Sequence, residues 1–305
     1  MSIISEATKE KTLELIRETQ NGNEPPGTTD GMGNKGYYHW MHRTFRNATF
    51  DALAMVLNDA AVKRFQARYL QNHIMVPKED GEAIIEIVST LAEECKKRGI
   101  AIISGETSYH EHSQELEISV SLIGDKYLDR KPNRFEIGDY LIGVESSGLM
   151  SNSFTEIRKI YGDEFRKEFV EPTFIYYDAI INLLKRPDGF INGMAHITGG
   201  AFSKLAKLVG KNTDVLMEKN SYLKPHDVFY EIKERGKLTD EEMYKIFNCG
   251  VGFVISAPRR SKGDIEEIIA EFISDGFRAA SIGKVVQGNG NVRIQSSFSE
   301  REIVL

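Results

Sequence analysis

Two turns of small residues constrain the fold more than any other feature, because each joins an apolar strand to a helix. The first turn, at 146–148, follows an apolar stretch and precedes helical spacing over 154–160. The second, at 198–200, follows a stretch that ends at Ala195 and His196 and precedes another helical segment. Strand, turn and helix in this order predict layered α and β structure.

The first half of the chain has its own helices and strands. Apolar residues recur at three- and four-residue spacing over 83–98 and stop before Gly99, which predicts an amphipathic helix with a glycine end. Residues 50–62 are apolar on nearly every side and predict a buried helix. Residues 100–103 predict a buried strand, and the alternation at 116–122 predicts a half-buried one. The fold class we predict is therefore α+β.

The length of the chain indicates two domains. Its 305 residues are about twice the usual size of a domain. The segment 125–138 is charged and contains Pro132, as linkers commonly are. We predict an N-terminal domain over residues 1–135 and a C-terminal α/β domain over residues 136–305.

Composition excludes several classes of protein. Acidic residues outnumber basic ones, 45 to 39, so the surface as a whole repels nucleic acid and anionic lipid. No apolar stretch approaches the roughly 20 residues that span a bilayer. Cys95 and Cys249 do not make a disulfide framework. We expect a cytoplasmic protein with neither a nucleic-acid partner nor a membrane anchor.

A first site candidate is the segment 29–35, which reads as a loop. Asp30 supplies a carboxylate, Gly31 and Gly33 let the backbone approach a ligand closely, and Lys35 supplies an ammonium group. A carboxylate together with a lysine suits a magnesium-bound polyphosphate. Acidic, glycine-rich segments are also common as plain turns, and that alternative stays open.

Further carboxylates accompany this loop. Asp59 follows Asn58 within the apolar helix, where an unpaired buried charge destabilises the folded state by roughly several kcal/mol. A cation should therefore lie beside it, either a metal ion or the side chain of Lys63 or Arg64; the alternative is that its carboxylate caps a neighbouring loop. Glu106 follows a buried strand in a small-residue turn, where it suits a hard cation or is simply solvated.

The two strand–turn–helix units suit a phosphorylated substrate, since unpaired backbone amides at a helix start attract phosphate. His196, at a strand end, is either a general acid or base or a structural residue. We interpret Cys249 as a packed residue rather than a nucleophile. The aromatic and basic run 37–46 is too short to form a nucleic-acid surface in an acidic chain, and we predict that it forms an edge strand.

Several runs together resemble the aminoimidazole ribonucleotide synthetases, also called phosphoribosylformylglycinamidine cyclo-ligases. Residues 243–252, MYKIFNCGVG, are similar to the family's MYRTFNCGVG. Residues 30–35 stand where that family has DGVGTK, and residues 58–59 stand where it has the ND of VND. Residues 105–107 match the end of its GGET, and residues 196–200 match its HLTGG. The resemblance extends from about Gly27 to the C-terminus.

This resemblance implies an ATP-dependent ring closure in purine synthesis. The substrate would be formylglycinamidine ribonucleotide, whose formyl-amide oxygen is phosphorylated before a nitrogen of the same molecule attacks. The family also implies a homodimer in which two N-terminal mixed sheets form a barrel, with ATP and Mg²⁺ bound near that interface and substrate bound by the C-terminal domain.

Matching the motifs residue by residue implies a set of site roles. Catalytic roles fall to His196, Lys35 and Asp59. The implied metal ligands are Asp30, Asp59 and Glu106. The implied ATP and phosphate contacts are Asp30, Gly31, Gly33, Lys35, Asn58, Asp59, Gly105 and Glu106. The implied substrate contacts are Ser147, Gly148, Ser151, Asn152, Thr198, Gly199 and Gly200.

The chain departs from the family pattern in a few positions. Asn34 stands in place of a threonine, Ser104 and Ser153 stand in place of glycines, and the segment before Thr29 is shorter than usual and lacks a glycine-rich loop. Two alternatives therefore stay open. One is another ATP-using member of the superfamily, such as formylglycinamidine synthetase, selenophosphate synthetase, thiamine-monophosphate kinase or a hydrogenase maturation factor. The other is a dimeric binding protein without turnover.

Overall fold

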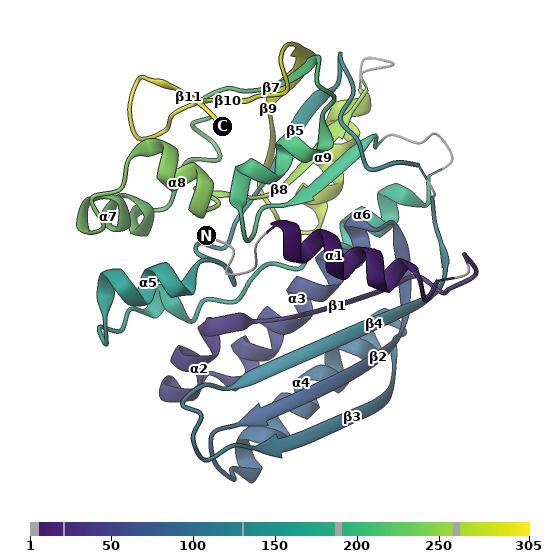
Figure 1. The fold of residues 1–305 in the computed structure, drawn as a ribbon, viewed down its shortest axis with the longest axis vertical. Coiled ribbons are helices and arrows are strands. Elements are labelled where there is room, and N and C mark those ends of the chain that lie inside the picture. The colour runs from purple at the N-terminus through teal and green to yellow at the C-terminus, as the bar shows by residue number, and fades with distance from the viewer. Residues whose placement is uncertain (1–5, 21, 130, 187–190, 259–262) are drawn as a thin grey trace.

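The computed structural model describes residues 6–20, 22–129, 131–186, 191–258 and 263–305. Two mixed sheets organise the chain, one of four strands in the N-terminal half and one of seven in the C-terminal half (Figure 1). This confirms the predicted α+β class. Helix α1 (Glu6–Arg17) precedes both sheets, and its Leu13 and Ile16 side chains are about half exposed.

The N-terminal sheet has the strand order β1-β4-β2-β3, where β1 is Gly27–Gly31, β2 is Phe65–Val76, β3 is Ala101–Tyr109 and β4 is Glu117–Tyr127. Strands β2 and β3 run parallel, and the other pairs are antiparallel. Within one chain this sheet is open, so the predicted barrel requires a second chain and stays a prediction.

Two long helices accompany this sheet, as the sequence predicted. Helix α4 (Gly81–Arg98) ends at Gly99, whose φ of 65° is the left-handed conformation that suits glycine at a helix end. Helix α3 (Phe45–Val62) contacts β1, β2 and β4 and also α6 and β6 of the C-terminal half. It is apolar on nearly every side because it is packed from both directions.

The segment that we predicted to be a loop begins as a strand. Asp30 lies on β1, after which a 3₁₀ helix η1 (Gly33–Lys35) leads into helix α2 (Gly36–His42). The glycines here serve close packing: a Cβ on Gly31 would lie 2.9 Å from the Ile118 carbonyl oxygen, and one on Gly36 only 1.8 Å from that of Leu116. The prediction of an edge strand over 37–46 is wrong, since α2 and the start of α3 occupy that run.

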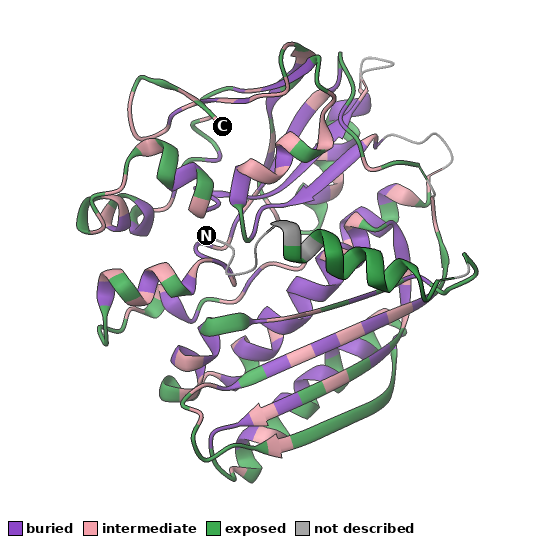
Figure 2. Cartoon of the chain, in the orientation of Figure 1, coloured by how far each residue is buried: buried purple, intermediate pink, exposed green. Residues whose placement is uncertain are grey.

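Strand β3 also differs from expectation. It was predicted to be buried, yet Ile102 and Ile103 are 39% and 52% exposed, and Figure 2 shows β3 exposed along almost its whole length. The reason is its place at the edge of the sheet, which a local apolar run does not reveal. Glu106 consequently lies within the strand and not in a turn.

The C-terminal sheet has the strand order β11-β10-β7-β9-β5-β8-β6. Its strands are β5 (Tyr140–Glu145), β6 (Gly193–His196), β7 (Thr213–Met217), β8 (Val251–Ala257), β9 (Ala279–Gln287), β10 (Val292–Gln295) and β11 (Glu302–Val304). The helices are α5 (Phe154–Tyr161), α6 (Tyr177–Leu184), α7 (Asp227–Arg235), α8 (Asp240–Ile246) and α9 (Asp264–Ser274), with 3₁₀ helices η2 (Lys167–Phe169) and η3 (Ala201–Leu208). Both predicted strand–turn–helix units are present, the second with a 3₁₀ helix in place of an α-helix.

The two halves share a hydrophobic core. One cluster runs from the inner face of the N-terminal sheet through α3 to α6, α9, β5 and β8. Across this junction, Arg64 donates hydrogen bonds to the backbone oxygens of Ile191 and Asn192. The division at residue 135 stays a prediction. None of the helices in the described ranges is both long and apolar enough to cross a membrane.

Candidate functional site

Asp30 and Asp59 come together where β1 packs against α3. Burial raises the pKa of both carboxyl groups, and the charge of Asp30 raises that of Asp59 further. Asp30 accepts a hydrogen bond from the amide of Gly31 at 2.7 Å. The carboxylate of Asp59 has no hydrogen-bond or ion-pair partner among the described residues. The pair therefore keeps oxygen atoms available to a ligand.

The salt bridge that we considered for Asp59 does not form in the described part of the chain. Lys63 donates instead to the backbone oxygen of Gly27 at 3.1 Å, and Arg64 pairs with Asp129 at 2.9 Å. Lys63 still lowers the pKa of both carboxyl groups of the pair through its charge, against the larger effect of burial. This leaves an acid pair that is only partly neutralised.

Asn58, next to Asp59, is fully buried and links the two halves of the chain. Its Nδ2 donates to the backbone oxygen of Phe174 at 2.9 Å, and its Oδ1 accepts from the amide of Tyr176 at 2.8 Å. The same Nδ2 lies 3.3 Å from Nε2 of His196. These contacts occupy the whole amide group, so in this conformation Asn58 positions His196.

The contacts of Asn58 determine the tautomer of His196. Since Oδ1 of Asn58 accepts from a backbone amide, the group that faces His196 is the NH₂, and Nε2 must act as the acceptor. The ring hydrogen then lies on Nδ1, which is buried without a hydrogen-bond partner among the described residues. Burial, aided by the charge of Lys204, holds the pKa of His196 well below its usual value. The imidazole is therefore neutral near pH 7.

Lys35 lies in a buried network and makes no contact with the acid pair. Its ammonium is 0% exposed, forms an ion pair with Asp51 at 2.8 Å and donates to the backbone oxygen of Glu171. Burial alone would raise the pKa of Asp51, but Lys35 and His39 hold it well below its usual range. Asp51 also accepts from the amide and hydroxyl of Thr173 at 2.7 and 2.6 Å. Lys35 reaches a phosphate only if it leaves this network.

Asp51 and His39 were not among the site residues predicted from the sequence. A signal was present for Asp51, because a carboxylate at the start of an otherwise apolar helix requires a buried cation. Nothing in the local pattern indicates that this cation is Lys35.

The predicted substrate turns lie at the ends of strands β5 and β6. The hydroxyl groups of Ser146 and Ser147 are buried without hydrogen-bond partners in the described residues. Asn248, in the run 243–252, donates to the backbone oxygen of Gly148 at 2.8 Å and thereby fixes that turn. Buried hydroxyl groups without partners are rare in native proteins, which supports a ligand at the turn.

Of the other predicted substrate contacts, three side chains are already hydrogen-bonded within the protein, and two glycines are exposed. The hydroxyl oxygens of Ser151 and Thr173 are 3.3 Å apart, and since Thr173 donates its hydrogen to Asp51, Ser151 is the donor of this pair. Asn152 donates to the Ile246 backbone oxygen at 2.9 Å. Thr198 accepts a hydrogen bond from Lys204 at 2.7 Å. Gly199 and Gly200 are exposed in the turn, and the φ of 82° at Gly200 suits glycine.

Glu106 lies far from the acid pair of its own chain. In the register of the sheet, Gly31 is opposite Ser119, Ser119 opposite His73, and His73 opposite Glu106. Three strand spacings separate the ends of this row, about 14 Å at ~4.8 Å each. Two carboxylates that share one ion lie within about 5 Å of each other. Within the ranges described, no three acidic, histidine or cysteine side chains form a metal cluster.

Comparison with known proteins decides the family. The model of the AIR synthase related protein N-terminal domain matches residues 20–125, and that of the C-terminal domain matches residues 136–295. The chain belongs to the AIR synthase family. Among its relatives, the phosphoribosylformylglycinamidine cyclo-ligase of Bacillus pumilus (strain SAFR-032) is 31% identical over 285 residues, covering 86% of this chain and 80% of the relative. That of Clostridium perfringens (strain 13 / Type A) is 32% identical over 284 residues, covering 88% and 83%.

Solved structures show the same fold. E. coli HypE, a hydrogenase maturation protein, matches with a TM-score of 0.67 at 21% identity and covers 100% of this chain and 91% of its own. Thiamine monophosphate kinase from Aquifex aeolicus matches with a TM-score of 0.65 at 15% identity, covering 99% and 100%. At these identities the likeness concerns the fold alone.

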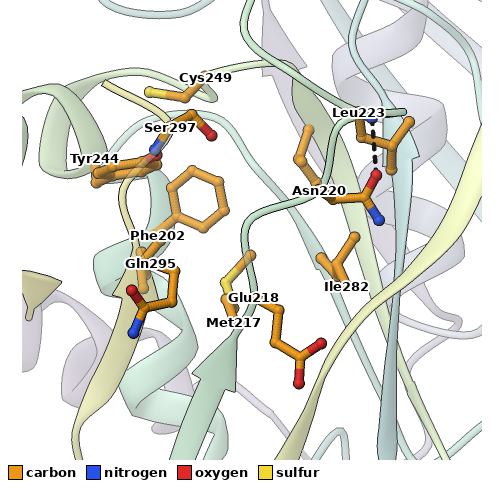
Figure 3. Close-up of a pocket in the computed structure, with 12 residues that line it drawn as sticks. Phe202, Met217, Glu218, Asn220, Leu223, Tyr244, Cys249, Ile282, Gln295 and Ser297 are labelled. Atoms are coloured by element: carbon orange, nitrogen blue, oxygen red, sulfur yellow. Dashed lines mark hydrogen bonds between the residues drawn. The ribbon is translucent and has the colours of Figure 1, made fainter. Parts of the chain in front are cut away.

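The run 243–252, similar to an AIR synthase motif, contributes to packing in this chain. Cys249 lines a pocket together with Phe202 and Tyr244 (Figure 3), and none of the predicted site residues line it. The sulfur lies 3.6 and 3.5 Å from the backbone oxygens of Met243 and Phe247, which share its one hydrogen. Burial raises the pKa of Cys249 well above its usual value, so its thiol is protonated near pH 7 and is a poor nucleophile.

Proposed function

We propose that this protein is an ATP-dependent phosphoribosylformylglycinamidine cyclo-ligase of purine biosynthesis. The observation that carries the proposal is the similarity to cyclo-ligases, at 31% and 32% identity over most of both chains. The site is consistent with that chemistry, since an acid pair, a neutral histidine and two serine and glycine turns lie at the junction of the two sheets.

The reaction has two steps. The formyl-amide oxygen of formylglycinamidine ribonucleotide forms a bond to the terminal phosphorus of ATP as the bond to ADP breaks. A nitrogen of the same molecule then attacks the activated carbon, phosphate leaves, and a proton is lost. His196 presents its Nδ1 hydrogen and, being neutral, suits a donor to a developing negative oxygen better than it suits a base.

Asp30 and Asp59 are the proposed ligands of a magnesium ion. Carboxylate oxygens are the ligands that Mg²⁺ prefers, and the carboxylate of Asp59 has no hydrogen-bond or ion-pair partner in the described structure. The ion, when bound, neutralises charge on the phosphates of ATP. Gly31, Gly33 and Lys35 stay predicted phosphate contacts, and Lys35 takes this role only after leaving Asp51.

A homodimer would complete the site. Strand β3 exposes Ile102, Ile103 and Tyr109 on the edge of the sheet, and an exposed apolar edge strand is a ready site for pairing with a second chain. Pairing two N-terminal sheets would cover this strand and would let Glu106 of the partner subunit approach Asp30. Gly105 lies beside it, where a Cβ would lie 2.7 Å from Asn72. Two free cysteines are consistent with a cytoplasmic location.

Phosphate release from ATP and Mg²⁺, with and without formylglycinamidine ribonucleotide, tests the function. We expect release that depends on this substrate, together with aminoimidazole ribonucleotide as the ring product. Release with thiamine monophosphate in place of the nucleotide, or no release with any substrate, would refute the proposal. The second outcome, combined with substrate binding, would favour the non-catalytic binding protein.

A further inference from the structure

Lys204 lies at the junction of the two halves, against His196 and Thr198, although no sequence motif marked it. It is on η3, directly after the turn that contains Thr198. Its ammonium donates to Oγ1 of Thr198 at 2.7 Å and to the backbone oxygen of His196 at 3.2 Å. These two bonds hold the positive charge at the end of strand β6.

The charge of Lys204 acts on the N-terminal half of the chain. Burial lowers the pKa of Lys204, and the charges of Asp59 and Asp30 oppose that shift. Lys204 in turn lowers the pKa of both carboxyl groups against the larger effect of burial. No ion pair joins Lys204 to either acid in the described structure. Geometry gives the same placement, because Lys204 donates to the backbone of His196, and the ring of His196 lies 3.3 Å from Asn58, the residue before Asp59 on α3. A cation of the C-terminal half and two anions of the N-terminal half are therefore gathered at one junction.

A ligand that carries both signs of charge fits this arrangement. A metal ion alone would be attracted by the acid pair and repelled by the ammonium of Lys204. A phosphate alone would be attracted by the ammonium and repelled by the acid pair. A metal-bound phosphate satisfies both sides, because its metal faces carboxylates and its oxygens accept hydrogen bonds. Lysine has three N–H donors, and two are used by Thr198 and His196. The third is the donor that a phosphate oxygen would accept from.

We propose that Lys204 binds the terminal phosphate of ATP, while Asp30 and Asp59 hold the metal ion. This inference rests on the proposed function and adds a residue to it. As the phosphoryl group leaves ADP and bonds to the formyl-amide oxygen, Lys204 stabilises the charge on its oxygens and transfers no proton. Its bond to the backbone of His196 places that charge next to the residue that faces the substrate.

Equilibrium binding of nucleotides tests this contact without relying on turnover. Binding of a non-hydrolysable ATP analogue and of ADP, both with Mg²⁺, is measured by calorimetry for the wild type, K204M, K204R and K207M. Lys207 is the matched control, because it is exposed on the same 3₁₀ helix. We expect K204M to weaken binding of the analogue about 10- to 100-fold, the range for a charged hydrogen bond. Binding of ADP should change less than about 3-fold, since ADP lacks that phosphate.

The outcomes separate the two proposals. If K204M loses affinity equally for both nucleotides, or for neither, Lys204 does not bind the terminal phosphate. If K207M shows the same selective loss, the effect is one of general charge and the inference fails. K204R keeps a cation and should retain most of the affinity, which also covers the case in which K204M does not fold. A wild-type protein that binds neither nucleotide would instead refute the ATP-dependent function itself.

Discussion

Nδ2 of Asn58 lies 3.3 Å from Nε2 of His196, two residues 138 positions apart in the chain that meet where the sheets adjoin. The contact makes Nε2 an acceptor and leaves the hydrogen on Nδ1. It ties the helix that carries Asp59 to the strand that ends in the substrate turn. A charge on the imidazole would disturb both elements at once.

The first prediction concerns the protonation of His196. Because its folded pKa lies below its unfolded value of about 6.5, the unfolded chain binds the proton more readily. The stability that this residue contributes is present above pH ~6.5 and is lost as the pH falls from there toward the folded pKa. Histidine ¹⁵N chemical shifts should show a neutral ring with hydrogen on Nδ1 at pH 7. A ring hydrogen on Nε2 would contradict the assignment.

The second prediction concerns Asp59. Replacement by alanine should reduce magnesium-ATP turnover by at least about 100-fold, the scale of losing a group that stabilises transition-state charge. The same change removes a partly buried carboxylate that Asp30 repels, so the melting temperature without ligand should stay the same or rise. Exposed Asp163 gives the control variant D163A. Full activity of D59A would contradict the metal assignment.

The third prediction concerns the buried network of Lys35. Asp51→Asn leaves a fully buried ammonium without its counter-charge, which should cost about 3–5 kcal/mol in the free energy of unfolding. Denaturant unfolding at pH 7 measures this cost. The exposed pair of Lys11 and Glu14 is the control, and Glu14→Gln should change stability by less than about 1 kcal/mol. Equal effects of the two changes would show that the buried pair is not structural.

The fourth prediction concerns the exposed edge strand. Ile103→Glu on β3 should convert the proposed homodimer to a monomer, because a carboxylate would be buried between two sheets. Light scattering coupled to size-exclusion chromatography measures the mass. Ile85 is 70% exposed on α4, and Ile85→Glu should leave the dimer intact. A wild-type monomer, or a dimeric I103E, would rule out this interface.

Local pattern was sufficient for much of the fold. Helical spacing before Gly99 predicted α4, and the apolar run around Asn58 predicted the buried part of α3. Both strand–turn–helix units could be predicted because alternation, glycine and helical spacing follow one another within about 20 residues. The motifs at 30–35 and 243–252 similarly indicated the family.

Local pattern failed where neighbouring strands set the outcome. The glycine-rich segment 29–35 indicated a loop, yet Gly31 allows the chain to pass close to the backbone of β4. The apolar residues of β3 indicated burial, yet the strand lies at the edge of the sheet. Whether a glycine serves a turn or a close approach depends on residues far away in the sequence.

The sequence by itself determined which side chains this protein has for chemistry, since carboxylates, histidine and small-residue turns recur in short motifs that a family resemblance identifies. Only the tertiary structure decided how they are used. It pairs Lys35 with Asp51, turns Asn58 toward His196, and holds Lys204 against His196 and Thr198. These partners are selected by burial and charge across the junction of two sheets. Contacts between residues so far apart in the sequence produce no periodic pattern of residues along the chain.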